Sequence, residues 1–235
     1  GTILLSTPTF LRSYLKRVPP EDFASLEVVV VGAEKLPTPL SDLFEKRFGV
    51  RPIEGYGATE ASPVIAVNTP MHYRPGTVGR LLPGMEARME DVEGIDQGGR
   101  AFVRGPNIMA GYLKADKPGV LQPPKDGWHD TGDIVEIDDE GFVTIQGRVK
   151  RFTKIGGEMI SLPAVEGYVS AVWPDAEHAI VSRPDPRKGE QLVLFTTEKH
   201  PRLATLRAWG KEHGVAELAI PRDIRVLDEM PVLGT

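Results

Sequence analysis

Apolar runs and helical apolar stripes alternate along the first third of the chain. Continuous apolar runs predict strands at 2–6, 26–32 and 50–55, the last of them the weakest. Between the runs, apolar side chains recur at helical spacing, in one segment that begins after Thr7 and in another that ends at Gly49. The β-branched run at 26–32 is typical of a strand buried on both faces. The order strand, helix, strand, helix, strand predicts a parallel α/β sheet.

Two glycine-containing segments follow strands of this sheet. "GAEKL" (32–36) comes after the second strand, and "GYGATE" (55–60) after the third. Parallel strands point the same way, and open α/β sheets bind ligands at the carboxyl ends of their strands. We therefore expect both segments to face a common crevice.

From residue 76 the pattern changes to short alternating segments separated by glycines. "DDEG" (138–141), between "IVEI" and "FVTIQ", is a hairpin signal. Residues 76–147 are therefore predicted to form antiparallel β structure, a small barrel.

The rest of the chain predicts a small, separate α+β domain. Its expected helices and strands are 163–172, 178–182, 191–197, a helix around Leu203 to Trp209, and 223–227. The basic stretch "GRVKRFTK" (147–154) lies at the junction and is predicted to be a linker.

Composition narrows the class of protein. The chain has 235 residues, a formal net charge of −5 and no cysteine. The negative charge argues against a nucleic-acid binder, because phosphate neutralisation requires a basic surface. The five histidines form no H-x3-H pair, and no apolar run reaches the roughly 18 to 20 residues that span a bilayer. Neither end resembles a natural terminus, so we expect a soluble piece of a longer chain.

"GYGATE" is the first candidate site. Glycines allow close backbone approach, so a flat ligand could stack on Tyr56 while Thr59 contacts a phosphate and Glu60 holds a magnesium ion. The alternative is a turn in which Thr59 caps a helix and Glu60 lies in its first turn.

Two later segments carry further candidates. Asp133, in "GWHDTGD" (127–133), suits the two hydroxyls of a ribose, or else forms an Asx-turn. Arg148, in "GRVKRFTKIGGEMISLPAVE" (147–166), could reach a ribose or a phosphate, or else belong to a solvated basic linker.

These segments, in this order and with "RGPNIMAGYL" (104–113) between them, resemble the adenylate-forming superfamily of acyl and aryl synthetases and luciferases. The resemblance covers essentially the whole chain. It implies that ATP and a carboxylic acid give an acyl-adenylate and pyrophosphate, and that the acyl group then passes to a thiol.

The resemblance also implies roles for individual residues. Tyr56, between Gly55 and Gly57, stacks on adenine; Thr59 contacts phosphate and Glu60 binds Mg²⁺. The remaining nucleotide ligands are Gly32, Ala33 and Glu34 at the base, and Asp133 and Arg148 at the ribose.

The resemblance further implies a mobile C-terminal domain. Lys150 is the hinge about which that domain swings, and Gly156 and Gly157 line a pantetheine tunnel. The predicted divisions are 1–75, a partial parallel α/β subdomain; 76–147, the antiparallel subdomain; 148–150, the hinge; and 151–235, the mobile domain.

The segments "PGTVGRLLPGM" (75–85), "KPGVL" (117–121) and "KGEQLVLFTT" (188–197) carry a narrower resemblance, to the synthetase half of bacterial 2-acylglycerophosphoethanolamine acyltransferase/acyl-[acyl carrier protein] synthetases. It implies a long-chain fatty acid substrate, acyl carrier protein as acceptor, lysophospholipid reacylation, and a full-length relative on the cytoplasmic side of the bacterial inner membrane. Arg151 stands where many relatives carry an acid, and a basic patch at 148–154 would suit an acidic carrier protein.

Two motifs of the family are missing from these residues. Neither the Ser/Thr/Gly-rich phosphate loop nor the adenylation lysine occurs here. We therefore expect this piece to be a partial nucleotide binder, inactive alone. Small residues at 55–66, namely Ala58, Ala61 and Ser62, could leave room for an acyl chain.

Alternative functions are a fatty acyl-CoA ligase, which shares the adenylation motifs, and a non-catalytic adenylate-binding module. A Rossmann-type oxidoreductase is disfavoured because no G-x-G-x-x-G follows an early strand with an acidic residue about 20 positions later.

Overall fold

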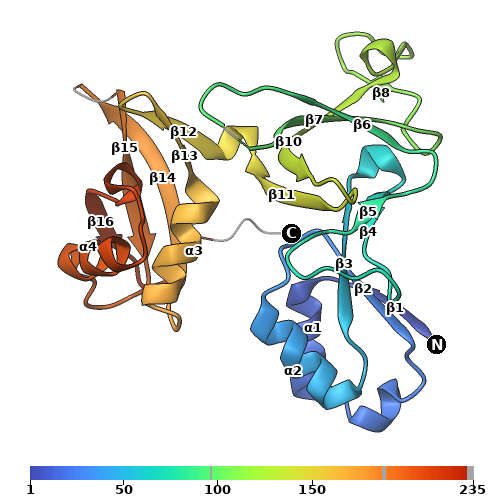
Figure 1. Ribbon diagram of the computed structural model, residues 1–235, viewed down its shortest axis with the longest axis horizontal. Coiled ribbons are helices and arrows are strands. Elements are labelled where there is room, and N and C mark those ends of the chain that lie inside the picture. The colour runs from blue at the N-terminus through green and yellow to red at the C-terminus, as the bar shows by residue number, and fades with distance from the viewer. Residues whose placement is uncertain (96, 187–188, 232–235) are drawn as a thin grey trace. The chain divides into compact units, whose positions relative to one another are not determined.

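The computed structural model describes residues 1–95, 97–186 and 189–231 (Figure 1). The chain divides into two compact units. The first unit holds Gly1–Asp91 and Gln97–Gln146, and the second holds the rest of the described chain. The segment 92–95 therefore belongs with the C-terminal part, although residues on either side of it belong to the first unit.

The first unit begins with the predicted alternation of strands and helices. Strands β1 and β2 pair in parallel, as do β2 and β3. The five elements are β1 (Ile3–Ser6), α1 (Pro8–Arg17), β2 (Val28–Val31), α2 (Thr38–Phe48) and β3 (Pro52–Gly57). The predicted parallel α/β portion is thus confirmed.

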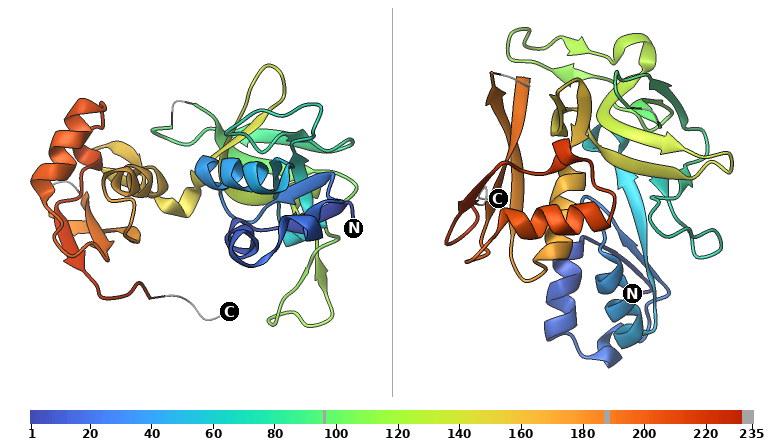
Figure 2. Two further views of the ribbon diagram at one scale, coloured as in Figure 1. Left: turned by 90° about the horizontal axis from the view of Figure 1, so that it is seen from below. Right: turned by 60° about the vertical axis from the view of Figure 1, so that its left-hand side comes forward.

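Local signals define the helices, as expected. The Thr7 hydroxyl accepts a hydrogen bond from Phe10 N at 3.4 Å and so caps α1. Helix α2 ends at Gly49, whose φ of 76° is the left-handed conformation that glycine adopts most easily. Helices α1 and α2 lie beside the parallel strands of the first unit (Figure 1 and Figure 2). Leu11 of α1 and Phe44 of α2, both fully buried, share one core cluster with Val29 and Val31 of β2.

The expectation that the second strand is buried on both faces is wrong for the described residues. Val29 and Val31 are buried under the helices, whereas Val28 and Val30 are only half-buried. On strand β1, the face that continues the half-buried face of β2 carries Ile3 and Leu5, which are 64% and 75% exposed.

The chain then adds two antiparallel strands to this sheet. Strand β4 (Val64–Val67) pairs with β3, and β5 (Arg80–Leu81) pairs with β4, so the sheet order is β1-β2-β3-β4-β5. A one-turn 3₁₀ helix, η2 (Thr59–Ala61), connects β3 to β4.

The region expected to be antiparallel forms a four-stranded antiparallel sheet in the order β11-β10-β7-β6. Its strands are β6 (Glu86–Glu90), β7 (Gly99–Arg104), β10 (His129–Ile137) and β11 (Val143–Arg148). The predicted turn at 138–141 is confirmed, since Asp138 N donates to Phe142 O at 3.1 Å and Gly141 N to Asp138 O at 2.8 Å. A separate hairpin, β8 (Tyr112–Leu113) with β9 (Leu121–Gln122), lies between β7 and β10 in the chain.

The second unit contains the predicted helices and strands and one further hairpin. Its elements are β12 (Phe152–Ile155), β13 (Glu158–Ser161), α3 (Leu162–Val172), β14 (His178–Asp185), β15 (Gly189–Thr196), α4 (Leu203–Glu212) and β16 (Asp223–Val226). The stretch 147–154, expected to be a linker, instead consists of the end of β11, a 3₁₀ turn (Val149–Arg151) and most of β12.

A single core holds this unit together. Helices α3 and α4 pack on one face of the β14-β15-β16 sheet, where Leu192, Leu194 and Leu206 are almost completely buried. Tyr168 of α3 stacks on Trp209 of α4 with ring centroids 5.8 Å apart. Burial raises the pKa of the Tyr168 hydroxyl. Across the described residues, no helix is both long and apolar enough to cross a membrane.

Candidate active site

The "GYG" segment forms the end of strand β3, where the chain turns back into β4. A side chain at Gly57 would place its Cβ 2.0 Å from the carbonyl oxygen of Pro63, so only glycine fits there. Ala58 N donates to the same carbonyl at 2.8 Å. A Cβ at Gly55 would meet its neighbours at 3.4 Å or more, which is ordinary contact. Glycine is therefore required at position 57 because the backbone turns back closely on itself there, and not because a ligand needs the space.

The segments at 32–36 and 55–60 lie at the same edge of the sheet, as expected from parallel strands. Val31 stands opposite Glu54 in the register of β2 and β3. A Cβ on Gly32 would lie 3.4 Å from the carbonyl oxygen of Gly55. Burial raises the pKa of Glu54, which also accepts a backbone hydrogen bond from Leu36.

The residues after β2 are displayed at the surface. Ala33 has a φ of 68°, which turns the chain sharply, and both Ala33 and Glu34 are exposed. The Thr9 hydroxyl donates to the two carboxylate oxygens of Glu34 at 3.1 and 2.9 Å. The turn after β2 is therefore tied to the first turn of α1.

Tyr56 and Asp133 are joined directly. Tyr56 Oη donates to Asp133 Oδ2 at 2.6 Å, although the two residues are 77 positions apart in the chain. Tyr56 is 9% exposed and Asp133 6% exposed. The predicted base ligand on β3 and the predicted ribose ligand on β10 thus lie in one place.

An Asx-turn, the alternative considered for Asp133, is formed in the same segment by Asp130. Asp130 Oδ1 accepts from Gly132 N at 3.0 Å. The Arg100 guanidinium, which is hydrogen-bonded to Asp130, lowers the pKa of that carboxyl. Asp133 N donates to the hydroxyl of Thr131 at 3.1 Å.

Glu60 lies in η2, immediately after the "GYG" strand. Its Oε1 accepts from Tyr112 Oη at 2.6 Å, and this bond raises the pKa of Tyr112. The alternative for this segment, a turn in which Thr59 caps a helix and Glu60 lies in its first turn, is confirmed for Glu60 but not for Thr59, because Ala58 occupies the N-cap position of η2 and no side chain caps that helix. Thr59 is exposed.

The segment 104–113 holds the turn around η2 by hydrogen bonds. Asn107 Nδ2 donates to the carbonyl oxygens of Ala61 and Val64, at 2.7 and 2.8 Å. Met109 N donates to the carbonyl of Glu60 at 2.8 Å. No local pattern in "RGPNIMAGYL" indicated these contacts, since the partners are far apart in the chain.

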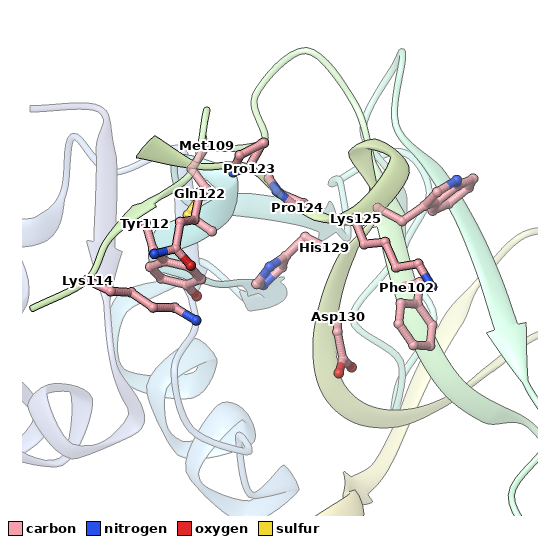
Figure 3. A pocket seen from close by; sticks show the side chains of 11 residues that line it. Phe102, Met109, Tyr112, Lys114, Gln122, Pro123, Pro124, Lys125, His129 and Asp130 are labelled. Atoms are coloured by element: carbon pink, nitrogen blue, oxygen red, sulfur yellow. The ribbon is translucent and has the colours of Figure 1, made fainter. Parts of the chain in front are cut away.

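A surface pocket of about 410 Å³ borders this region (Figure 3). Tyr112 and Lys114 form one side, Phe102 and Lys125 lie on the other, and His129 stands between them. No sequence motif indicated this pocket, whose walls come from β7, the β8–β9 hairpin and β10.

A magnesium ion bound with a nucleotide fits the chemistry of Glu60. Among the described residues, no group of three or more His, Cys, Asp or Glu side chains could hold a metal by itself. Mg²⁺ on a nucleotide needs no such group, because it uses one or two carboxylates with phosphate oxygens and water. Glu60 is a half-exposed carboxylate with one oxygen held by Tyr112.

Arg148 and Lys150, the predicted ribose ligand and the predicted hinge, belong to the second unit. Arg148 ends β11 and Lys150 lies in the following 3₁₀ turn, and both side chains are exposed. Their next neighbour, Arg151, binds Glu166 of α3 through an ion pair of 2.5 Å. Lys154 binds Glu93 at 2.7 Å.

The chain resembles curated ligases over nearly its whole length. It is 32% identical over 241 residues to 3-[(3aS,4S,7aS)-7a-methyl-1,5-dioxo-octahydro-1H-inden-4-yl]propanoyl:CoA ligase of Rhodococcus jostii, covering 98% of this chain and 45% of that protein. It is 29% identical over 218 residues to the long-chain-fatty-acid–CoA ligase of Salmonella typhimurium, covering 89% and 38%. The chain thus spans less than half the length of these relatives.

Structural comparison agrees. The O-succinylbenzoate coenzyme A synthetase of Bacillus subtilis, in complex with ATP and magnesium ion, matches with a TM-score of 0.79 and 26% identity, over 98% of this chain and 48% of that one. The parallel and antiparallel sheets thus match the adenylate-forming enzyme fold. Residues 1–113 match the family model described as AMP-binding enzyme. These matches support the AMP-binding enzyme family, within the acyl-CoA ligase superfamily, as the family of this chain.

Proposed function

We propose that this chain supplies part of the nucleotide site of an enzyme that joins a carboxylic acid to AMP and then transfers the acyl group to a thiol. The bond between Tyr56 and Asp133 carries the proposal, because it unites two segments that bear the predicted base and ribose ligands. Glu60 follows on the same strand-to-turn connection.

Each predicted residue has a role in this proposal. Tyr56 offers its ring to adenine, and Gly32, with the exposed residues Ala33 and Glu34, lines the base. The Asp133 carboxylate can accept hydrogen bonds from both ribose hydroxyls, since it has two oxygens.

The phosphate end of the nucleotide would meet η2. Gly57 permits the tight connection from β3 to this turn, and Gly55 is proposed to lie against the nucleotide. Thr59 donates its exposed hydroxyl to a phosphate oxygen, and Glu60 holds the magnesium ion. When bound, Mg²⁺ would supply positive charge that stabilises the phosphate oxygens. Arg148 is proposed to contact the ribose, and Lys150 to act as the hinge.

The first proposed reaction is a displacement at phosphorus. A carboxylate oxygen of the acid forms a bond to the α-phosphorus of ATP, and the bond from that phosphorus to the bridging oxygen breaks. Pyrophosphate leaves with the bonding electrons. Attack of a thiol on the acyl carbon would then release AMP and give a thioester. Catalysis of both steps depends mainly on positioning and on charge stabilisation.

The acid is proposed to be a long-chain fatty acid, as the name of the Salmonella typhimurium relative suggests. The small residues considered for an acyl pocket support this only in part. Ala61 is fully buried in the core of the first unit, so its small size serves packing. Ala58 and Ser62 stay candidates.

Two thiols are candidates for the acceptor. Both relatives are named as CoA ligases, which favours coenzyme A. Acyl carrier protein, with lysophospholipid reacylation as its purpose, is the second candidate and rests on the basic stretch 148–154. Arg151 and Lys154 are engaged with Glu166 and Glu93, which reduces the charge available to a partner.

Equilibrium binding of AMP to the purified chain tests the proposal. Isothermal titration should detect AMP, and Asp133→Asn should weaken its binding about tenfold, the cost of roughly one charge-assisted hydrogen bond. Asp116→Asn, an exposed change in the loop after β8, is the matched control. Absence of AMP binding, or equal affinities for the wild type and Asp133→Asn, would reject the proposed nucleotide site.

An experiment that identifies the thiol acceptor requires the complete enzyme that contains this chain. Thioester formation with coenzyme A should be at least as efficient as with acyl carrier protein if the relatives are the better guide. Arg151→Glu should then leave the KM for either thiol unchanged. A large rise in the KM for carrier protein alone would instead favour the carrier-protein alternative.

A further inference from the structure

The segment 107–112, here called the clamp segment, makes four hydrogen bonds to the turn that carries Glu60. Asn107 Nδ2 donates to the carbonyl of Ala61 in that turn and to the carbonyl of Val64, where β4 begins, at 2.7 and 2.8 Å. Met109 N donates to the Glu60 carbonyl at 2.8 Å. Tyr112 Oη donates to Glu60 Oε1 at 2.6 Å. One segment therefore holds both the backbone and the carboxylate of Glu60.

Gly111, in the clamp segment, allows the backbone conformation that places Tyr112 next to Glu60. Gly111 has a φ of 153°, and a Cβ there would lie 2.5 Å from the carbonyl oxygen of Gln122. Glycine at this position lets β8 pair closely with β9, in the register Tyr112 opposite Gln122. The hairpin thereby presents the Tyr112 hydroxyl to η2.

We propose that the clamp segment positions Glu60 as a ligand of magnesium-bound nucleotide, with Tyr112 as the residue that fixes the rotation of the carboxylate. This inference rests on the function proposed above. Mg²⁺ demands near-ideal octahedral geometry, so the orientation of its few protein ligands matters. Carboxylates that ligate metals are commonly held by a further hydrogen bond, and loss of that bond weakens metal binding.

The exposure of Tyr112 distinguishes positioning from packing. Its side chain is 44% exposed and lies in a two-stranded hairpin, so its hydroxyl contributes little to the core. A residue that served only folding would be expected to bury its ring. The hydroxyl instead donates its hydrogen bond to one carboxylate oxygen of Glu60, the proposed metal ligand.

The test compares ATP binding to the purified chain with Mg²⁺ and with EDTA. The ratio of the two affinities measures the contribution of the metal. Tyr112→Phe should reduce that ratio about tenfold, in line with the loss of a supporting contact to a metal ligand. It should leave the affinity in EDTA and the Tm unchanged. Tyr14→Phe, which removes a hydroxyl from α1, is the matched control, and Glu60→Gln is the reference for loss of the ligand.

The outcomes separate this inference from the proposed function. If Glu60→Gln lowers the ratio and Tyr112→Phe does not, the clamp inference is wrong and the metal role of Glu60 stands. If neither changes the ratio, the metal role fails and the clamp inference fails with it. If Tyr112→Phe lowers the Tm, or lowers the affinity in EDTA equally, Tyr112 serves the fold and the inference is overturned.

Discussion

Arg151 and Glu166 form an ion pair of 2.5 Å within the second unit, and Glu166 also accepts from the backbone of the adjacent sheet. Glu166 Oε1 receives a hydrogen bond from Ile180 N at 2.8 Å. The 3₁₀ turn that contains Lys150, helix α3 and strand β14 are therefore joined at one carboxylate oxygen. These contacts fix the 3₁₀ turn to the rest of the second unit.

This junction predicts a difference between two substitutions of Glu166. Glu166→Ala removes the acceptor for Ile180 N and should destabilise the second unit by about 1–3 kcal/mol. Glu166→Gln keeps an acceptor and loses only a partly exposed ion pair, which is worth about 0–1 kcal/mol. Urea unfolding followed by the fluorescence of Trp173 and Trp209 measures both. Equal stabilities of the two variants would show that the backbone contact contributes nothing.

Substitution by alanine should change the stability of the protein in opposite directions at Gly57 and at Gly167. At Gly57 the new Cβ would collide with the Pro63 carbonyl, so Gly57→Ala should cost about 3 kcal/mol or more, as overpacking does. At Gly167, in α3, a Cβ meets nothing within 4 Å. Gly167→Ala should therefore stabilise by about 0.5–1 kcal/mol, the helix preference for alanine. Thermal unfolding checks both, and a tolerated Gly57→Ala would contradict the described strand-to-turn geometry.

Much of the fold could be predicted because its signals are local. The run "VVVV", the Thr7 cap, Gly49 and the "DDEG" turn each specify structure within a few residues. Strand β12 was missed because "FTKI" lies in a basic stretch, and its charge suggested a solvated linker. Its alternation is nevertheless real, since Thr153 and Ile155 are the buried positions.

The candidate site could be predicted only in part, because its contacts join distant positions. The carboxyl-edge rule placed 32–36 beside 55–60, since both follow parallel strands. The bonds from Tyr56 to Asp133 and from Tyr112 to Glu60 span 77 and 52 residues. They depend on how β10 and the β8–β9 hairpin pack against β3 and η2, which no local pattern encodes.

The turn at 138–141 predicts a pH dependence. Hydrogen bonds from Phe142 N and Glu140 N, with the nearby charge of Arg74, hold the pKa of Asp138 below its usual value. Because the folded state has the lower pKa, this contribution is present above the unfolded pKa of about 4 and is lost as the pH falls through the folded value. Tm should therefore fall less between about pH 5 and pH 3 in Asp138→Asn than in the wild type.

A neighbouring residue supplies the control for this measurement. Asp139 lies in the same exposed turn, and Asp139→Asn makes the same change of charge. Its Tm should follow the wild-type profile. Parallel profiles for wild type and Asp138→Asn would show that the turn contributes no acid sensitivity.

The contributions of the hydroxyl and of the ring of Tyr56 to stability and to AMP affinity should be separable by substitution. Tyr56→Phe removes one donor from the buried Asp133 carboxylate and should cost about 1–3 kcal/mol of stability. It keeps the aromatic face, so AMP affinity should fall less than in Tyr56→Leu, which removes the ring as well. Titration of AMP into both variants, with Tm measured in parallel, separates the two effects. Equal AMP affinities for the two variants would mean that the ring does not stack on the base, and that Tyr56 acts through Asp133 alone.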